Sequence, residues 1–237
     1  MTPKVLLGIP SSGSINAQTV ITLISTILEN LETQFLGSLD VVVGPYIPVS
    51  RNQLVESALR AYYEEQITHI WFIDHDMILP KGTLTKLLSH QRPVVGGAYY
   101  VRTASMAQII QPVAFEVPWK MLPDIPASGL LKVDGMGMGC TLISCALLEQ
   151  MANHFNDRLW FQQPPVTLDG VTTLMGEDVF FFTRLKQMGV DAYLDCDVQC
   201  GHIKTHNIGR MDYEVFRSLA PSTLGAMTDP TLPVPIP

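Results

Sequence analysis

The first hundred residues alternate between short apolar runs and longer stretches with helical spacing. Four apolar runs are predicted as buried strands, at residues 4–9, 39–43, 69–73 and 93–98. Between the first three, residues 17–31 and 51–65 repeat apolar side chains at three- and four-residue steps, which predicts two helices with one apolar face each. In the first helix that face comprises Ala17, Val20, Ile21, Ile24, Ile27, Leu28 and Leu31. Because the strands are apolar along their whole length, this order predicts a parallel sheet covered on both faces.

The second half is less regular. Four prolines interrupt residues 101–132, where we expect loops and short edge strands. Further elements are predicted as a short helix at 80–89, a strand at 140–144 with a helix to 151, a helix at 176–188, and strands near 192–194 and 198–202. We therefore predict a single α/β domain over residues 1–220, followed by an extended proline-rich tail at 221–237.

Composition narrows the class of protein. Hydrophobic residues make up 47% of the 237 and charged residues 16%, which is enough for a substantial core. The net charge of −7 argues against broad electrostatic capture of nucleic acid. No apolar stretch is long enough to cross a bilayer and no signal peptide is evident, so a cytoplasmic location is expected. Four cysteines in a chain of this length indicate reduced thiols rather than a disulfide framework.

Two carboxylates stand where a buried strand stops. Asp74-His75-Asp76 follows the apolar run at 70–73. In extended backbone, positions i and i+2 point the same way, so both carboxylates would aim at one point. Mg²⁺ is usually held by one or two carboxylates together with phosphate oxygens of a substrate. The sequence therefore predicts a divalent metal and a phosphate-bearing substrate here, the alternative being a solvated turn that caps the next helix.

A third ligand is predicted far along the chain. His202 follows a strand-like segment, and its imidazole suits Mn²⁺ better than Mg²⁺. His206 competes for the same role. Cys196 and Cys200 complete a set with these two histidines that resembles a zinc site, but all four ligands crowd into eleven residues, whereas structural zinc sites take paired ligands from two separated segments.

Acidic and basic residues at predicted helix starts are further candidates. Glu177 and Asp178 open a helix, where they either complement its dipole or supply a general base that deprotonates an acceptor hydroxyl. Arg51 either pairs with a pyrophosphate or stacks on a base, or it is an ordinary exposed arginine. A P-loop is excluded because Gly8 and Gly13 are not followed by the required lysine.

Taken in order, these segments resemble a GT-A glycosyltransferase of the family-2 type, or its mannosylglycerate-synthase-like relatives. The likeness runs from about residue 4 to residue 209. It rests on Gly8-Ile9-Pro10, Ser50-Arg51-Asn52, Asp74-His75-Asp76, Gly137-Met138-Gly139, Gly176-Glu177-Asp178 and Gly201-His202. The fold that it implies is a Rossmann-like, mostly parallel sheet with helices on both faces and a small antiparallel or loop extension, with a nucleotide-binding half at about 1–100 and a donor-sugar and acceptor half at about 101–220.

The resemblance also implies roles for individual residues. The expected metal ligands are Asp74, Asp76 and His202, holding Mn²⁺ or Mg²⁺ against the diphosphate. The catalytic base would be Asp178 or Glu177. The donor pocket would be lined by Ile9, Pro10, Arg51, Asp74, Gly137 and Gly139, with the two glycines leaving room for the sugar.

The predicted function is a metal-dependent transfer of a sugar from a nucleoside-diphosphate sugar to a hydroxyl acceptor. One alternative is a nucleotidyltransferase, although residues 8–16 lack the basic phosphate loop typical of that class. Another is a non-catalytic module that binds a sugar nucleotide or glycan. The donor base and sugar, the acceptor, the stereochemistry and assembly into a homo-oligomer are left open by the sequence.

Overall fold

The chain is built on a seven-stranded sheet in which five strands run in one direction. The computed structural model describes residues 2–102, 110–168, 170–204, 210 and 214. The strand order is β10-β15-β5-β12-β3-β1-β2, and within it β10 and β12 run against the other five. These strands are β1 (Val5–Ser11), β2 (Leu36–Val43), β3 (His69–Ile73), β5 (Val94–Ala98), β10 (Leu130–Val133), β12 (Cys140–Ser144) and β15 (Ala192–Gln199).

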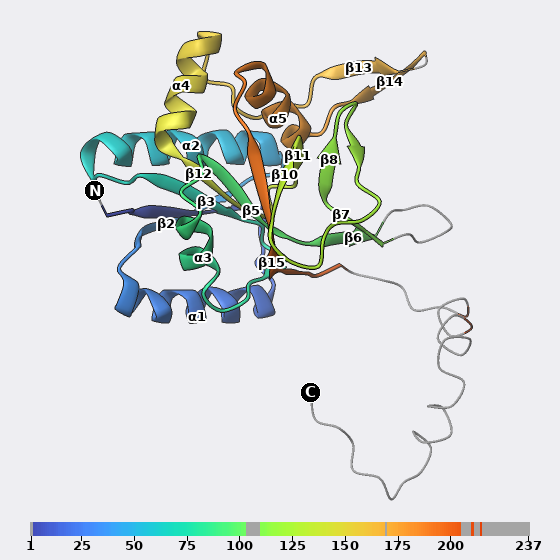
Figure 1. Ribbon diagram of the computed structural model, residues 1–237. Coiled ribbons are helices and arrows are strands. Elements are labelled where there is room, and N and C mark those ends of the chain that lie inside the picture. The colour runs from blue at the N-terminus through green and yellow to red at the C-terminus, as the bar shows by residue number, and fades with distance from the viewer. Residues whose placement is uncertain (1, 103–109, 169, 205–209, 211–213, 215–237) are drawn as a thin grey trace, which may run out of the picture. The chain divides into compact units, whose positions relative to one another are not determined.

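Helices cover both faces of this sheet. Figure 1 shows α1 (Ala17–Thr33) and α3 (Thr83–Ser89) below it, and α2 (Ile47–Glu64), α4 (Cys145–Phe155) and α5 (Glu177–Gln187) above it. The predicted α/β class with a mostly parallel sheet is therefore confirmed. The second helix begins at Ile47, four residues earlier than predicted, because a proline in its first turn presets the helical φ without losing a needed hydrogen bond.

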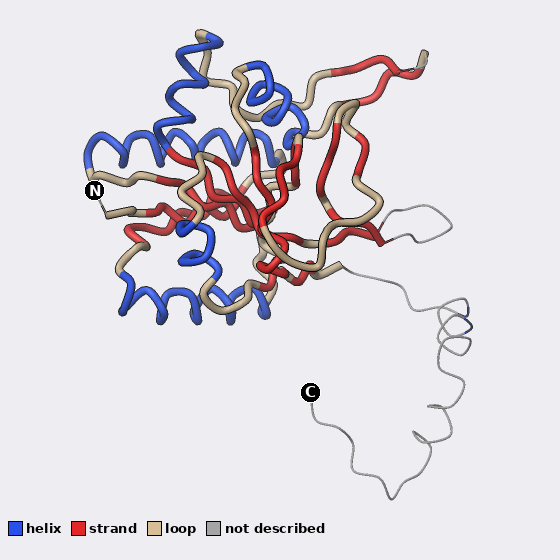
Figure 2. Tube along the Cα trace, viewed as in Figure 1, coloured by secondary structure: helices blue, strands red, loops and turns tan. Residues whose placement is uncertain are grey.

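Short strands form the predicted antiparallel extension. Figure 2 shows most of them to the right of the central sheet, away from the N-terminus. The pairs are β4 (Met77–Ile78) with β16 (Gly201–His202), β6 (Tyr100–Arg102) with β7 (Ile110–Pro112), β13 (Pro165–Leu168) with β14 (Val171–Leu174), and β8 (Ala114–Glu116) with both β9 (Lys120–Met121) and β11 (Gly135–Met136).

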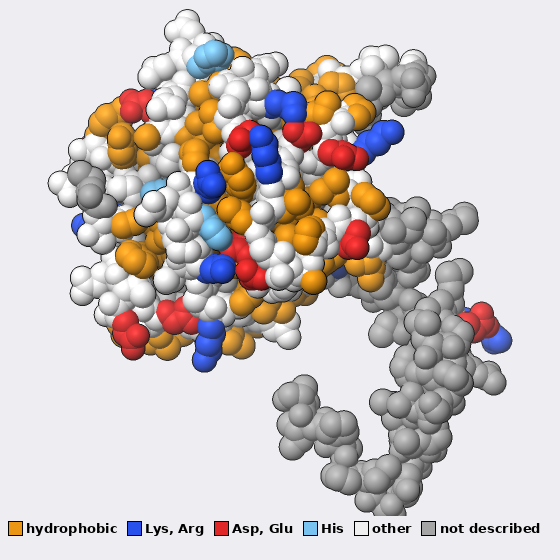
Figure 3. Space-filling view, viewed as in Figure 1, with side chains coloured by type: hydrophobic (Ala, Val, Ile, Leu, Met, Phe, Trp, Pro, Cys, Tyr) orange, Lys and Arg blue, Asp and Glu red, His pale blue; other side chains and the backbone are white. Residues whose placement is uncertain are grey.

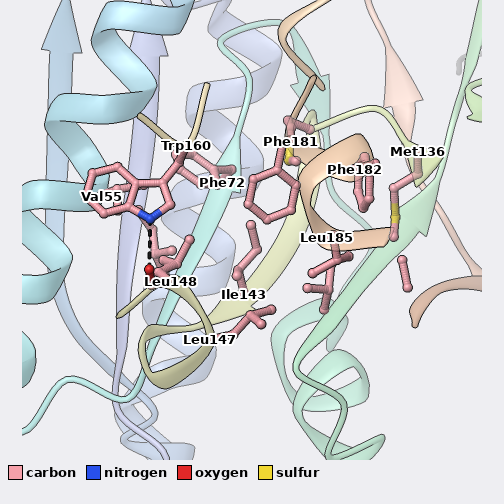
Figure 4. Close-up of a cluster of buried hydrophobic side chains, with 14 of the residues drawn as sticks. Val55, Phe72, Met136, Ile143, Leu147, Leu148, Trp160, Phe181, Phe182 and Leu185 are labelled. Carbon is pink, nitrogen blue, oxygen red and sulfur yellow. Dashed lines mark hydrogen bonds between the residues drawn. The ribbon is translucent and has the colours of Figure 1, made fainter. Parts of the chain in front are cut away.

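The larger part of the core lies under α2, α4 and α5. In Figure 4 the Trp160 ring lies beside Val55, and its Nε1 donates a hydrogen bond to the Leu148 carbonyl oxygen at 2.9 Å. Phe161, the next residue, stacks on Phe181 at 5.1 Å between ring centroids. These contacts fix the segment at residues 160–161 between α4 and α5, and that segment borders the site described below.

Helix α1 is confirmed, but its apolar face does not pack on the sheet. Thr19, Leu23 and Thr26 are buried instead. The outward side chains are 39% to 73% exposed, and they are Val20, Ile21, Ile24, Ile27, Leu28 and Leu31. Two tertiary hydrogen bonds hold the helix in this rotation: Asn16 N donates to the His75 carbonyl oxygen at 2.9 Å, and Gly82 N donates to Glu29 Oε2 at 3.0 Å.

The chain divides by its contacts into residues 1–203 and residues 204–237. His206 and the proline-rich tail lie outside the described residues, so the predicted domain of residues 1–220 and the extended tail stay predictions. Within the described part, no helix is long and apolar enough to cross a membrane. All four cysteines are buried free thiols, as predicted.

Candidate functional site

The chain turns after β3 instead of continuing extended. Met77 N donates to the Asp74 carbonyl oxygen at 3.2 Å, and His75 and Asp76 form the turn. The two-residue alternation assumed from the sequence therefore does not apply, because a turn rotates successive side chains away from the extended pattern. As a result the two carboxylates take different partners.

Asp74 is joined to a buried arginine. Arg51 of α2 donates from Nη2 to Asp74 Oδ1 at 2.9 Å and from Nη1 to Glu177 Oε1 at 3.1 Å, with its side chain 4% exposed. Burial opposes the charge of Arg51, but the two carboxylates outweigh it and the pKa of Arg51 is raised. Arg51 thus links α2, the end of β3 and the start of α5. It is not the exposed arginine of the alternative interpretation.

Asp76 meets His202 across 126 positions of sequence. β4 and β16 pair antiparallel with Met77 opposite His202, and Ile203 N donates to the Asp76 carbonyl oxygen at 2.8 Å. This pairing leaves His202 Nε2 3.4 Å from Asp76 Oδ2. His202 Nδ1 lies 2.9 Å from the Tyr100 carbonyl oxygen, which can only accept, so Nδ1 carries the proton. In the neutral ring Nε2 then turns its lone pair toward Asp76.

Asp76 and His202 together offer two side-chain groups of the kind that bind a divalent cation. A carboxylate oxygen and an imidazole lone pair repel unless a proton or a cation lies between them, and a backbone carbonyl on the far ring nitrogen is the usual support of a metal-bound histidine. In the part of the chain that the structure describes, three or more His, Cys, Asp or Glu side chains nowhere cluster so that they could hold a metal. The two residues therefore suit an ion that takes its remaining ligands from phosphate oxygens and water. Cys196, Cys200 and His202 form no such cluster, and His206 of the zinc alternative lies outside the described residues.

Glu177 and Asp178 lie in the first turn of α5 but in different surroundings. Glu177 accepts from Arg51 and, at 3.3 Å, from Gln163 Nε2. Asp178 has no such cation contact, and its Oδ1 accepts from Val179 N at 2.8 Å. Burial first, and then the charge of Glu177, raise the pKa of Asp178 to about 6. A carboxyl group with a raised pKa beside a carboxylate held by an arginine is typical of sites that need one base and one fixed charge.

Tyr99 fills the space beside the two predicted glycines. A Cβ on Gly137 would lie 1.8 Å from the Tyr99 hydroxyl oxygen, and Gly139 N donates to that same oxygen at 3.2 Å. The packing of Tyr99 therefore explains why residues without side chains stand here. Burial, together with the charges of Asp74 and Asp178, holds the pKa of Tyr99 well above its ordinary range. A role of the two glycines toward a donor sugar stays a prediction.

Ile9 and Pro10, predicted to line the nucleotide pocket, lie in the interior of the protein. Ile9 and Pro10 are buried within β1, and Ile9 packs with the apolar cluster on the α1 side of the sheet. What β1 presents at its end is the loop at residues 11–14, held by Ser11 Oγ, which accepts from Gly13 N at 3.1 Å. The predicted role of Ile9 and Pro10 in nucleotide binding stays a prediction.

An uncharged cavity of about 630 Å³ adjoins the ion-paired residues. It lies between the start of α2, the segment at 159–165 and the end of β14. Its lining contains no Asp, Glu, Lys or Arg and includes Tyr46, Val49, Phe161, Gln163 and Leu174. Because Gln163 also contacts Glu177, the cavity and the acidic start of α5 are neighbours.

Three residues of this region, Tyr99, Asn52 and Gln163, were given no role of their own from the sequence, although Asn52 stands in the segment Ser50-Arg51-Asn52. Tyr99 directly follows β5, and its place beyond the carboxyl end of a parallel strand was a usable signal. Asn52 holds the loop below the cavity, since its Oδ1 accepts from Trp160 N at 3.1 Å and Phe161 N at 3.0 Å. Gln163 sits in a proline-rich loop, and nothing in the local sequence marks it.

No protein-family model matches the chain, and neither does any curated protein. Solved structures do share its fold. The crystal structure of A197 from STIV aligns with a TM-score of 0.56 and 19% identity, over 85% of this chain and 86% of that one. GalNAc-T7, solved with UDP, GalNAc and Mn²⁺, aligns with a TM-score of 0.52 and 11% identity. That alignment covers 86% of this chain but 44% of the GalNAc-T7 chain. At these identities the likeness establishes the fold, which is GT-A-like.

Proposed function

We propose that the protein is a metal-dependent glycosyltransferase that moves a sugar from a nucleoside diphosphate to a hydroxyl acceptor. The observation that carries the proposal is the Asp76 and His202 pair, brought to 3.4 Å at one end of a GT-A-like sheet. The structural neighbour GalNAc-T7, which was solved with UDP and Mn²⁺, supports the same class.

Asp76 and His202 are the residues that would hold Mn²⁺ or Mg²⁺. When bound, the cation would offset the charge that develops on the departing nucleoside diphosphate. Asp74 was predicted as a further metal ligand, but its contact with Arg51 favours a role as the partner of that arginine. We assign Arg51 a positioning role, in which it keeps Asp74 and Glu177 in place between the donor and acceptor halves.

Asp178 is our candidate for the general base. Glu177 is engaged by Arg51 and Gln163, whereas the raised pKa of Asp178 suits a general base near neutral pH. In an inverting reaction, Asp178 takes the proton of the acceptor hydroxyl while that oxygen bonds to the anomeric carbon. The bond from this carbon to the diphosphate oxygen breaks, and its electron pair leaves with the diphosphate.

The uncharged cavity beside Glu177 is where we place the acceptor. Exposed Tyr46 and Leu174 offer flat and apolar contacts, and Gln163 adds a hydrogen-bonding group. Such a lining favours a neutral acceptor with an apolar face and disfavours a phosphorylated one, because the lining contains no Lys or Arg to pair with phosphate.

Asp178→Asn is expected to raise the melting temperature by a few degrees at pH 7 but not at pH 4. A carboxyl whose folded pKa is about 6, against about 3.9 unfolded, destabilises the fold once it ionises, since each pKa unit is about 1.4 kcal/mol. The wild type therefore loses stability relative to the variant as pH rises from about 4 to about 6. Melting curves of both proteins across this range would measure the gap. A gap that does not change with pH would contradict the raised pKa.

A thermal-shift screen tests the proposed function. Full-length protein is mixed with UDP, GDP, CDP or dTDP and their sugars, with and without Mn²⁺. One nucleotide is expected to raise the melting temperature only when Mn²⁺ is present. At a hundredfold excess over its dissociation constant, binding adds about 3 kcal/mol to the free energy of unfolding. Absence of any metal-dependent shift would count against the proposal. A shift without release of nucleoside diphosphate in the presence of candidate acceptors would favour a non-catalytic binding module.

A further inference from the structure

Among the described residues, an exposed apolar surface runs along α1 and the edge strand β2. We call it the α1–β2 face. It consists of the six outward side chains of α1 described above, together with Leu39, Val41 and Val43 of β2, which are 42% to 65% exposed. The mechanism proposed above uses none of these residues.

The exposed apolar side chains of β2 lie on the same side of the sheet as α1. Leu39 and Val41 pair in register with Leu7 and Ile9 of β1, whose side chains pack with Leu23 of α1. Residues in register on neighbouring strands point to the same face, so the bare side of β2 is the α1 side. The opposite side of β2 is covered, since Val42 packs on the cluster under α2.

The outward flank of α1 faces this bare strand. Glu29 reaches Gly82 next to α3, and it lines the hollow between α1 and α3 together with Glu32. At 3.6 residues per turn, Val20, Ile24 and Ile27 lie on the flank opposite Glu29. In Figure 3 hydrophobic side chains reach the surface along the lower margin, where Figure 1 places α1.

The size of the face is that of a protein interface. At the exposed fractions given above, its nine side chains present on the order of 800 Å² of apolar surface, whereas the largest patch on a typical monomer is about 300–600 Å². A standard interface buries about 800 Å² on each partner. The face is therefore large enough to hold a second protein chain.

Charge and backbone select the kind of partner. Residues 5–50 contain no Lys or Arg, which disfavours an anionic lipid surface, because interfacial helices bind it through basic side chains. Among the described strands β2 pairs only with β1, so its outer edge keeps unpaired backbone groups. Neither a lysine nor a proline protects that edge, and its one charge, Asp40, lies on the covered side with Val42. The nine side chains of the face are uncharged, so two copies of it would meet without like charges on the α1 side of the sheet.

We infer that the α1–β2 face binds a second copy of this chain. The two copies are related by a two-fold axis, with β2 beside β2 in antiparallel register and α1 against α1 on one side of the joined sheet. The pairing satisfies both strand edges and buries the apolar flank of both helices. It leaves the proposed metal pair and the uncharged cavity outside the interface residues.

Light scattering on full-length protein, with sedimentation to confirm mass, tests this inference. The wild type is expected to be a dimer at about 10 µM. The double variant Ile24→Glu with Val41→Glu is expected to be a monomer that keeps its melting transition, since both positions are exposed. The same holds for Ile24→Lys with Val41→Lys. Mixing the two variants should restore the dimer mass, because opposite charges then face each other across the axis.

Tyr63→Glu on α2 is the matched control, because Tyr63 is 66% exposed but lies outside the face. It should remain a dimer. A monomeric wild type, or a dimer that both charged double variants leave intact, would overturn the inference. So would a wild type that is monomeric in solution and binds neutral phosphatidylcholine vesicles through the same residues, which would assign the face to lipid. These outcomes are independent of nucleotide binding and so of the proposed function.

Discussion

Asp76→Asn and His202→Gln are each expected to abolish the Mn²⁺-dependent thermal shift and to reduce sugar transfer by about 10²- to 10³-fold. Removing one preorganised group that stabilises charge on a leaving group costs about 3 to 4 kcal/mol in the transition state. Both replacements keep the size of the side chain closely, and Gln retains a hydrogen-bonding group near the Tyr100 carbonyl. The melting temperature without nucleotide should therefore change little.

The loss should lie in metal-dependent binding and not in folding. Asp197→Asn and His154→Ala are matched controls, because both side chains are exposed and lie on β15 and α4, away from the pair. They should retain the full thermal shift. If Asp76→Asn still shows the Mn²⁺-dependent shift of the wild type, the two residues do not hold the ion, and the proposed function loses the observation that carries it.

Arg51→Ala is expected to lower the melting temperature by on the order of 10 °C. The replacement leaves Asp74 and Glu177 without their cation at a poorly exposed site, and breaking a buried ion pair in this way costs about 3–5 kcal/mol. In a domain of this size 1 kcal/mol corresponds to about 2–4 °C. Arg158→Ala is the matched control, since its pair with Glu56 is largely exposed, and it should change the melting temperature little.

A triple variant separates lost charge from lost packing. Arg51→Met, Asp74→Asn and Glu177→Gln together remove all three charges while keeping most of the volume, so much of the stability should return. Arg51→Lys should fall between wild type and alanine, because one ammonium group cannot reproduce the two-branched contact with both carboxylates. Stability equal to wild type in Arg51→Ala would contradict the role of Arg51 as the link between α2, β3 and α5.

For the two carboxylates after β3, the local sequence predicts their position but not their partners. Their position at the end of an apolar strand marked Asp74 and Asp76 as site residues, and the strand was found where predicted. Their separate partners could not be predicted. The turn at His75 directs one carboxylate to a helix 23 residues earlier and the other to a histidine 126 residues later, and neither distance is encoded near position 74.

The start of α5 shows the same limit. Two acidic residues at a helix N-terminus have one local explanation, the helix dipole. Only the tertiary structure shows that Arg51 contacts Glu177 and that burial raises the pKa of Asp178. Burial and charge contacts of this kind arise from segments that meet in space, so the choice between Glu177 and Asp178 had to stay open in the sequence.

Periodicity by itself determined the α/β class, the strands at the centre of the sheet and the existence of α1, because each depends on side chains within a few residues of one another. Tertiary structure alone decided which face of α1 is buried. Hydrogen bonds from Asn16 and to Glu29 rotate the helix so that Leu23 faces the sheet and the apolar stripe faces outward. A helical period states which side chains share a face, but the neighbours that anchor the helix determine whether that face meets the core, solvent or another chain.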